Sequence, residues 1–174
     1  AQKRIERLQE VPVPVTTISG ATLASSSQTR LQDYYNRIPG LGLALIGDGS
    51  TPAITIRGVT TGGLTNPTVG IVVDDVPYGT AVAIATAPTA PDVDPGDLAR
   101  MEVLRGPQGT LYGAASMGGL LKFVTVDPST ESLFGNVQLG IASVEEGEAG
   151  YTVRGALNVP VSETFAVRAS AFSS

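Results

Sequence analysis

The sequence contains no cysteine, no histidine and no tryptophan. The first two absences exclude a zinc site of the usual Cys/His type, together with Ser-His-Asp and Cys-His catalysis. The formal net charge is -5, so the chain lacks the basic surface that nucleic-acid-binding proteins use. We therefore expect a protein that is not an enzyme and that binds no metal, cofactor or nucleic acid.

Long hydrophobic runs are also missing. No segment approaches the roughly 18 consecutive apolar residues that suggest a transmembrane helix. Residues 1–7 are rich in charge and lack the apolar centre of a signal peptide, which favours a mature or truncated start. Any association with a membrane would therefore depend on β-strands.

Turn-forming residues are abundant instead, with 21 Gly and 12 Pro among 174 residues, and 42% of the chain is hydrophobic. This composition favours short strands and many turns over a helical bundle. The length suits one ordinary domain, or one domain followed by part of another.

The N-terminal part is predicted to contain an extended segment and a helix. Prolines within residues 11–18 exclude a helix there and favour an extended edge segment. A helix is predicted over residues 22–37, with Thr29 and Gln32 as a capping box, and Pro-Gly at 39–40 ends it. Its apolar face, which we expect in the core, consists of Leu31, Tyr34, Tyr35 and Ile38.

Short strands follow. They are predicted within residues 41–50 (ahead of a turn at 47–50) and at 54–56, 69–73, 101–104 and 120–126. Residues 74–77 are expected to form a turn, and residues 97–100 a short helical turn or an approach to the next strand. Residues 78–95 lack any period, and a loop of that length in a compact domain usually has a function.

A different pattern begins after Pro128. Residues 135–144, 150–159 and 164–174 each alternate between apolar and polar positions. The apolar positions are Val137, Leu139, Ile141, Tyr151, Val153, Leu157, Val159, Phe165, Val167 and Ala169. Segments of about ten residues with this alternation are typical of transmembrane β-strands, although ordinary antiparallel sheets show the same pattern.

Three motifs occur in a fixed order before that point. Ile54-Thr55-Ile56-Arg57-Gly58 comes first, and Val72-Val73-Asp74-Asp75-Val76-Pro77 follows it. The third is Met101-Glu102-Val103-Leu104-Arg105-Gly106-Pro107-Gln108-Gly109-Thr110-Leu111-Tyr112-Gly113, with Gly118-Gly119 beyond it. In this order and spacing, the motifs resemble the plug domain of TonB-dependent outer-membrane receptors over about residues 8–127. The alternating strands resemble, more weakly, the start of the family's barrel.

The resemblance implies a fold and a pair of functional residues. Residues 1–127 would form an α/β (α+β) plug domain with short helices and a mixed, mainly four-stranded sheet. Residues 128–174 would be the first antiparallel strands of an incomplete transmembrane β-barrel. Family members pair the two motif arginines with barrel glutamates, which implies a plug–barrel lock at Arg57 and Arg105. Those glutamates would lie in barrel segments that this sequence does not contain. From the residues alone, two surface arginines at strand ends are the simpler interpretation.

Other positions are assigned to structure rather than chemistry. Asp74 and Asp75 are adjacent on an extended segment and so do not converge, and we expect them to serve a turn and its hydrogen bonds. The glycine-rich segment lacks the Lys and Ser/Thr of a phosphate loop. Tight turns are expected at Gly106, Pro107, Gly109, Gly113, Gly118 and Gly119. For the acidic set Asp92, Asp94 and Asp97, a solvated loop is favoured over a weak cation site.

The function that the resemblance implies is that of an energy-coupled importer. The plug would bind an extracellular nutrient, by default a ferric siderophore, and admit it to the periplasm when TonB pulls a segment before Ala1. Expected partners are TonB, the remainder of the barrel, a small-molecule or metal-chelate substrate and outer-membrane lipid. The plug would lie inside the barrel in the outer membrane, with residue 1 on the periplasmic side. The candidate substrate-facing positions are Asp48, Ser50, Thr61, Thr65, Asn66, Tyr78, Thr80 and Thr86.

A rival hypothesis belongs to another class of protein. In it, the chain is a self-contained soluble binding or interaction domain, and the last strands complete its own sheet. Solubility discriminates the two, because a soluble domain is monomeric without detergent, whereas exposed barrel strands aggregate or need detergent.

Overall fold

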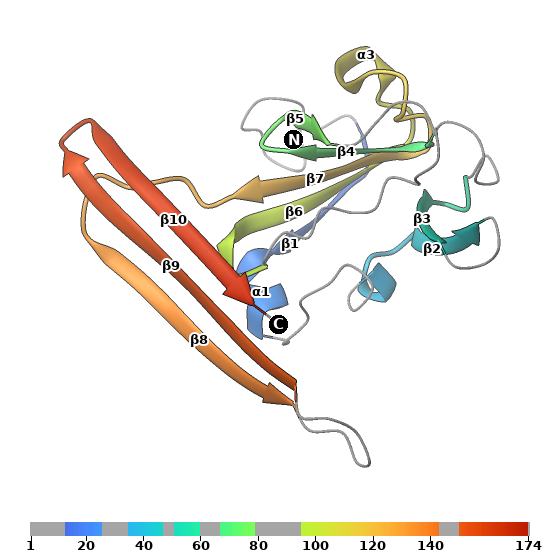
Figure 1. Cartoon of the computed structure of the whole chain (residues 1–174). Coiled ribbons are helices and arrows are strands. Elements are labelled where there is room, and N and C mark those ends of the chain that lie inside the picture. The colour runs from blue at the N-terminus through green and yellow to red at the C-terminus, as the bar shows by residue number, and fades with distance from the viewer. Residues whose placement is uncertain are drawn as a thin grey trace.

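A computed structural model of the chain describes residues 13–25, 35–46, 51–59, 67–78, 95–142 and 150–173 (Figure 1). These residues form a five-stranded sheet, a separate three-stranded sheet and a two-stranded hairpin, with a few short helices. No helix among them is both long enough and apolar enough to cross a membrane.

The five-stranded sheet is mixed, as expected, and has one strand more than expected. Its strands are β1 (Val15–Ser19), β4 (Val69–Val73), β5 (Val76–Tyr78), β6 (Leu98–Arg105) and β7 (Gly119–Thr125). They lie in the order β1-β6-β7-β4-β5, with β4 and β7 parallel and the other pairs antiparallel. The alternation of residues in β6 puts Met101 and Val103 on one face and Glu102 and Leu104 on the other.

The hydrophobic core lies mainly on one face of this sheet. Met101, Val103, Leu121 and Phe123 are buried there from the two central strands. The segments outside the sheet contribute Leu23, Ile38, Leu41 and Ile56. A smaller cluster on the opposite face contains Val72, Leu104 and Leu120. Full burial of each such side chain contributes about 1.5–3 kcal/mol, so this core holds the sheet and its flanking segments together.

The described helical segments are short. Helix α1 covers Gly20–Ser25, and single 3₁₀ turns cover Tyr35–Arg37 (η1) and Pro95–Asp97 (η2). The hydroxyl of Ser19 accepts a hydrogen bond from the backbone N–H of Thr22 (3.2 Å), so the described helix begins two residues before the predicted start. Residues 26–34, including the predicted capping box Thr29 and Gln32 and the apolar positions Leu31 and Tyr34, lie outside the described residues.

Two local predictions around the sheet were only partly right. The turn predicted at 74–77 is confined to Asp74 and Asp75, because residues 76–78 continue as edge strand β5. Pro77 fits there because the edge strand leaves one side without a ladder partner. Of the predicted helical turn or approach at 97–100, Asp97 does end the 3₁₀ turn of residues 95–97, but residues 98–100 belong to β6, since Leu98 and Arg100 pair with β7. The short helix α3 follows at Gly109–Tyr112.

The hairpin consists of β2 (Leu41–Ile46) and β3 (Thr51–Ile56), paired in antiparallel register from Leu41↔Ile56 to Ile46↔Thr51. Its two end residues, Leu41 and Ile56, are both buried in the main core. The hairpin therefore packs against the sheet through the end from which Arg57 emerges.

The three-stranded sheet confirms the predicted alternating strands. It contains β8 (Phe134–Ala142), β9 (Gly150–Ser162) and β10 (Phe165–Ser173) in the order β10-β9-β8, all antiparallel. The turn between β9 and β10 lies at residues 163–164, slightly later than predicted. The register pairs Asn158 with both Phe134 and Arg168.

The polarity of this sheet is the reverse of a water-soluble one. On its apolar face, Val137 is 77% exposed and Ile141 is 87% exposed. On its polar face, Arg154 and Asn158 are buried. A large exposed apolar face is stable only against lipid or another protein, so this pattern agrees with a transmembrane wall and gives no support to the soluble-domain hypothesis.

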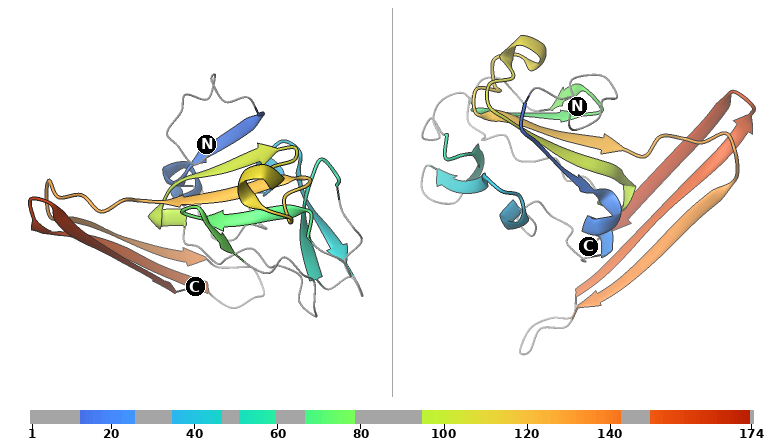
Figure 2. Two further views of the ribbon diagram at one scale, coloured as in Figure 1. Left: turned by 90° about the horizontal axis from the view of Figure 1, so that it is seen from above. Right: turned by 180° about the vertical axis from the view of Figure 1, so that it is seen from behind.

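The three-stranded sheet lies beside one end of the five-stranded sheet. Figures 1 and 2 show the three-stranded sheet beside the end where β6 begins and β7 finishes. The β2–β3 hairpin lies toward the opposite end, where β6 finishes. Strand β6 therefore connects the two regions that bear on function.

Candidate functional site

Arg105, the last residue of β6, is fixed by three contacts to distant parts of the chain. Its backbone N–H donates to the carbonyl of Pro14 (3.0 Å). Its guanidinium donates from Nε to the carbonyl of Pro39 (3.0 Å) and from Nη2 to the hydroxyl of Thr16 on β1. The side chain is therefore held in place, because two separate segments accept its hydrogen bonds.

Arg57 is brought to the same place by the turn that follows β3. Its backbone N–H donates to the carbonyl of Gly40 (2.7 Å), and its own φ is 55°, an uncommon conformation for a residue other than glycine. A Cβ built on Gly40 would lie 3.6 Å from Cγ of Arg57 and 3.7 Å from Nε of Arg105. The two arginines therefore flank Gly40, although 48 positions separate them in the sequence.

Arg57 and Arg105 have no acidic partner in the part of the chain that the structure describes. No carboxylate there is within ion-pair distance of either side chain. Arg57 is exposed, and Arg105 is partly exposed. The sequence singled out both residues, but it gave no indication of Thr16, Pro39 or Gly40 as the groups that position them.

The glycine-rich segment after Arg105 forms a closed turn. Gly106 N–H donates to the carbonyl of Gly118 (3.1 Å), and Gly118 N–H donates to that of Thr68 (2.8 Å). Gly119 has φ 150°, and a Cβ there would collide with the carbonyl of Leu104 and the side chain of Ile56. By contrast, added methyl groups at Gly109 and Gly113 would meet no atom within 4 Å, and Pro107 is exposed. The turn thus requires glycine most strongly at Gly119, beside the arginines.

Asp74 and Asp75 occupy the two central positions of the β4–β5 turn, with φ values of 47° and 67°. Positive φ at both positions is the type I′ geometry that two-residue hairpins prefer. The carboxylate of Asp74 accepts hydrogen bonds from Thr125, and that of Asp75 accepts one from Nζ of Lys122 (2.7 Å). Their side chains therefore tie the turn to β7.

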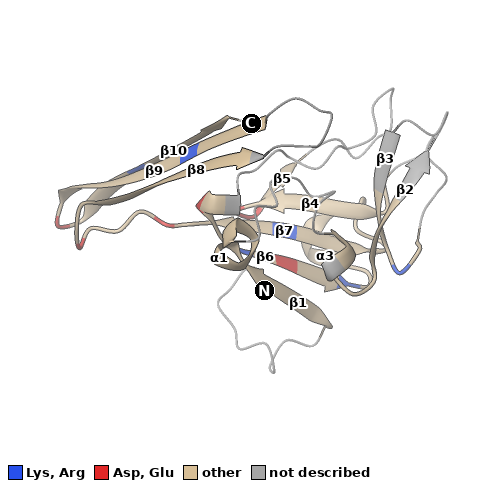
Figure 3. Ribbon diagram, turned by 90° about the horizontal axis from the view of Figure 1, so that it is seen from below, with Lys and Arg blue, Asp and Glu red and all other residues tan. Residues whose placement is uncertain are grey.

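A row of acid and base side chains crosses the same face of the sheet. Glu102 and Lys122 are register partners, both buried, and Figure 3 shows acidic and basic positions side by side on β6 and β7. Arg100 donates from Nε to Glu102 Oε1 (2.6 Å). The ion pairs Arg100–Glu102 and Lys122–Asp75 provide partners for charges that would be costly to bury alone. No cluster of three or more His, Cys, Asp or Glu among the described residues has the arrangement of a metal site.

Of the candidate substrate-facing positions, only Tyr78 falls among the described residues. It lies on β5, opposite Ile71, and is 46% exposed. The other seven, at 48, 50, 61, 65, 66, 80 and 86, lie outside the described residues, so their role stays a prediction.

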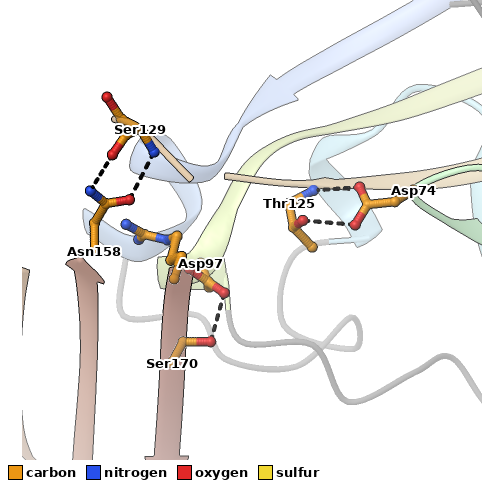
Figure 4. Close-up of polar contacts among 7 residues, drawn as sticks. Asp74, Asp97, Thr125, Ser129, Asn158 and Ser170 are labelled. Atoms are coloured by element: carbon orange, nitrogen blue, oxygen red, sulfur yellow. Dashed lines mark hydrogen bonds and ion pairs between the residues drawn. The ribbon is translucent and has the colours of Figure 1, made fainter. Parts of the chain in front are cut away.

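Asp97 has a role that the sequence did not indicate. Arg168 on β10 donates from Nε to Asp97 Oδ1 (2.8 Å), and the hydroxyl of Ser170 donates to Oδ2 (2.6 Å), as Figure 4 shows for Ser170. The prediction of a solvated loop is therefore wrong for this residue; Asp92 and Asp94 lie outside the described residues. The alternation of β10 had marked Arg168 as polar-facing, but no local pattern pairs it with a residue 71 positions away.

Comparison with known families decides the identity of this fold. The family model "TonB-dependent Receptor Plug Domain" matches residues 7–120, which is more than half of the chain. The chain belongs to the TonB-dependent receptors. The resemblance carried by the strand-Arg-Gly motifs is therefore confirmed.

Individual relatives agree with this assignment. The pesticin receptor of Yersinia pestis is 29% identical over 144 residues, covering 82% of this chain and 20% of the relative. The iron-regulated outer membrane virulence protein of Vibrio cholerae is 30% identical over 163 residues, covering 87% of this chain and 24% of the relative. The crystal structure of the ferric yersiniabactin uptake receptor from Yersinia pestis superposes with a TM-score of 0.66 at 29% identity, covering 86% of this chain and 22% of that one.

Membership has direct consequences. TonB-dependent receptors are not enzymes, and the family places the chain at the outer membrane, as expected. The predicted fold, a mixed-sheet plug followed by antiparallel barrel strands, is confirmed by the same comparisons. The chain spans about a quarter or less of the length of these relatives, so only this portion of a receptor is compared.

Proposed function

We propose that this chain is the plug and the first wall strands of an energy-coupled outer-membrane importer. In this proposal residues 1–127 form the plug, and residues 128–174 form three strands of the barrel wall. The boundary is supported by the gap between β7, which ends at Thr125, and β8, which begins at Phe134 in a different sheet. Hereafter, β8–β10 are called the wall strands.

The convergence of Arg57 and Arg105 beside Gly40 carries the proposal. Two cations at one end of the plug, without a carboxylate among the described residues, need an anionic partner to lower their electrostatic energy when they are enclosed. Glutamates on the remaining barrel would supply that partner. Arg57 and Arg105 together with those glutamates are called the arginine lock. Separation of the arginines from the glutamates would free this end of the plug.

The proposed substrate is an iron chelate. Relatives of this chain are named as receptors for pesticin, hemin and ferric yersiniabactin, and one is a ferrichrome transporter and phage receptor. Ferric siderophores are therefore the default cargo. The proposed energy source is the inner-membrane protein TonB, which would pull on the chain before Ala1 from the periplasmic side.

Uptake by the full-length receptor tests this function. We expect cells that make the receptor to accumulate iron-55 offered as ferrichrome, enterobactin or hemin complexes, only when the host has TonB. Arg57→Ala should abolish or weaken that uptake, whereas Arg57→Lys, which keeps the charge, should retain part of it. Uptake that is the same with and without TonB, or none from any of the three complexes, would contradict the proposal.

The proposed boundary has its own test. The 174-residue chain should be monodisperse only in detergent, because the wall strands expose an apolar face, and cleavage near 127–128 should release a soluble core. A monomer in plain buffer that resists protease from end to end would instead show that both sheets form one soluble domain.

A further inference from the structure

A polar junction joins the plug sheet to the wall strands at the start of β6. Asp97 accepts hydrogen bonds from Arg168 and Ser170, two neighbouring inward positions of β10. The side chains of Asp97 and Arg168 are only 19% and 8% exposed. Water therefore has little access to the ion pair, which strengthens it relative to a surface pair.

Asp97 also belongs to the end of the plug sheet. Its backbone carbonyl accepts a hydrogen bond from the N–H of Val126 (3.0 Å), just beyond β7, and the next residue begins β6. The same residue therefore closes the β6–β7 end of the sheet through its backbone and holds the wall through its side chain.

A second contact lies one strand away. Asn158 on β9 is fully buried; its Oδ1 accepts from Ser129 N–H (2.8 Å), and its Nδ2 donates to the carbonyls of Ser129 (2.8 Å) and Ser132 (3.0 Å). Figure 4 shows this pair of residues near Asp97 and Ser170. Asn158 is the register partner of Arg168. The contact made by Asn158 and the contact made by Arg168 therefore lie next to each other on adjacent strands.

Removal of Asp97 from the junction would be costly. Nη1 of Arg168 is buried and already has no hydrogen-bond partner among the described residues, while its guanidinium lies 5.7 Å from the ring centroid of Phe134. Loss of Asp97 would leave a buried cation without the carboxylate that pairs with it in the described part of the chain. Breaking a buried ion pair in this way is strongly unfavourable, so the junction resists opening.

The junction and the arginine lock lie at opposite ends of one strand. Strand β6 has eight residues from Leu98 to Arg105, which span about 26 Å at about 3.3 Å per residue. Among the described strands, edge strand β1, at the N-terminal side, pairs only with β6. Force applied from the N-terminus therefore reaches β1 and the arginines before it reaches Asp97.

We propose that Asp97, Arg168 and Ser170 form a second plug–wall attachment, the wall anchor, that remains closed when the arginine lock opens. The contact of Asn158 with Ser129 supports it by holding the chain that leaves β7 against the wall strands. The role of this wall anchor in transport rests on the proposed function. The existence of the wall anchor does not depend on that function. The plug would then open as a hinged body that keeps its β6–β7 end on the wall, rather than leave the barrel whole.

Hydrogen exchange on the full-length receptor tests the attachment. Asp97→Asn, Arg168→Gln and the double variant should each raise amide exchange in peptides covering residues 95–105 and 120–127 by about tenfold or more. The double variant should add little to the worse single variant, because the two residues act on each other. Peptides covering residues 41–56 at the lock end should be unchanged.

Glu163→Gln is the matched control, because Glu163 is an exposed carboxylate in the β9–β10 turn and should leave all these peptides unchanged. Heat-modifiable gel mobility verifies that each variant has a folded barrel. Additive effects of the two single variants, or a change of less than about twofold, would overturn the wall anchor.

A reversible cross-link tests the second half of the proposal. The chain has no cysteine, so Asp97→Cys with Ser170→Cys introduces one defined pair, after replacement of any cysteine elsewhere in the receptor. A short bifunctional thiol reagent then joins them, and a reductant separates them. We expect TonB-dependent uptake of iron-55 complexes to continue in the cross-linked receptor.

Two negative outcomes are distinguishable. If uptake stops on cross-linking and returns on reduction, the importer function stands, but the claim that the anchor remains closed is wrong. If the uncross-linked receptor imports none of the iron complexes, the proposed function fails, whereas the hydrogen-exchange result still decides whether the anchor exists.

Discussion

Thr125 donates two hydrogen bonds to the carboxylate of Asp74, from its backbone N–H to Oδ1 (2.9 Å) and from its hydroxyl to Oδ2 (2.7 Å) (Figure 4). The backbone N–H of Asp74 in turn donates to the carbonyl of Phe123 (3.0 Å). One residue of the β4–β5 turn thus holds the end of β7 at two positions. The acidic pair of the central motif therefore serves to fix the parallel β4–β7 pairing.

Asp74→Ala should destabilise the plug by about 2 kcal/mol. It removes both hydrogen bonds to Thr125, and alanine tolerates the positive φ of this position less well than Asp does. Asp74→Asn should cost about half as much, because an amide keeps one acceptor and suits the type I′ turn. Urea unfolding of the receptor in detergent measures both, and equal losses for the two variants would contradict this role.

Asn158→Ala should destabilise the junction between the sheets by about 3 kcal/mol. It leaves the backbone groups of Ser129 and Ser132 without their partner in a buried site. Asn136→Ala, an exposed asparagine on the inward face of neighbouring strand β8, should change stability by less than about 0.5 kcal/mol. Thermal unfolding compares them, and similar shifts would show that the buried hydrogen bonds contribute little.

Gly119→Ala should be among the most damaging substitutions in the chain, at about 3 kcal/mol or more. The new methyl group would collide with the carbonyl of Leu104 and lie 2.7 Å from the side chain of Ile56, and φ is positive. Gly109→Ala should be neutral or stabilising by about 0.5 kcal/mol, because it adds a methyl group in open space at the start of α3. Urea midpoints in the opposite order would refute the described backbone.

The two arginines should differ in what they contribute to the plug itself. Arg105→Ala should destabilise it by about 1–2 kcal/mol, because it removes the contacts to Pro39 and Thr16. Arg57→Ala should change plug stability by less than about 0.5 kcal/mol, because that side chain is exposed. Differential scanning calorimetry of the receptor separates the two cases. If Arg57→Ala destabilised the plug as much as Arg105→Ala did, its effect on uptake would no longer report on a lock.

Local patterns predicted the core strands and missed elements that depend on pairing. The alternation around Met101 and Val103 identified β6, because a period of two is a property of the segment itself. The first residues of β6 and the edge strand β5 were missed. Leu98-Ala99-Arg100 has no clear alternation, and Pro77 argues against a strand unless the strand lies at an edge.

The strand-Arg-Gly motifs, the glycine turn after Arg105, and the apolar and polar faces of the wall strands can be read from the sequence, because periodicity and turn chemistry are local. The meeting of distant residues is a property of the folded chain: Arg57 lies beside Arg105 at Gly40, and Asp97 pairs with Arg168 across 71 positions. Such contacts depend on the packing of whole sheets and on the burial of a charge that needs a partner. No local pattern encodes which distant residue supplies it.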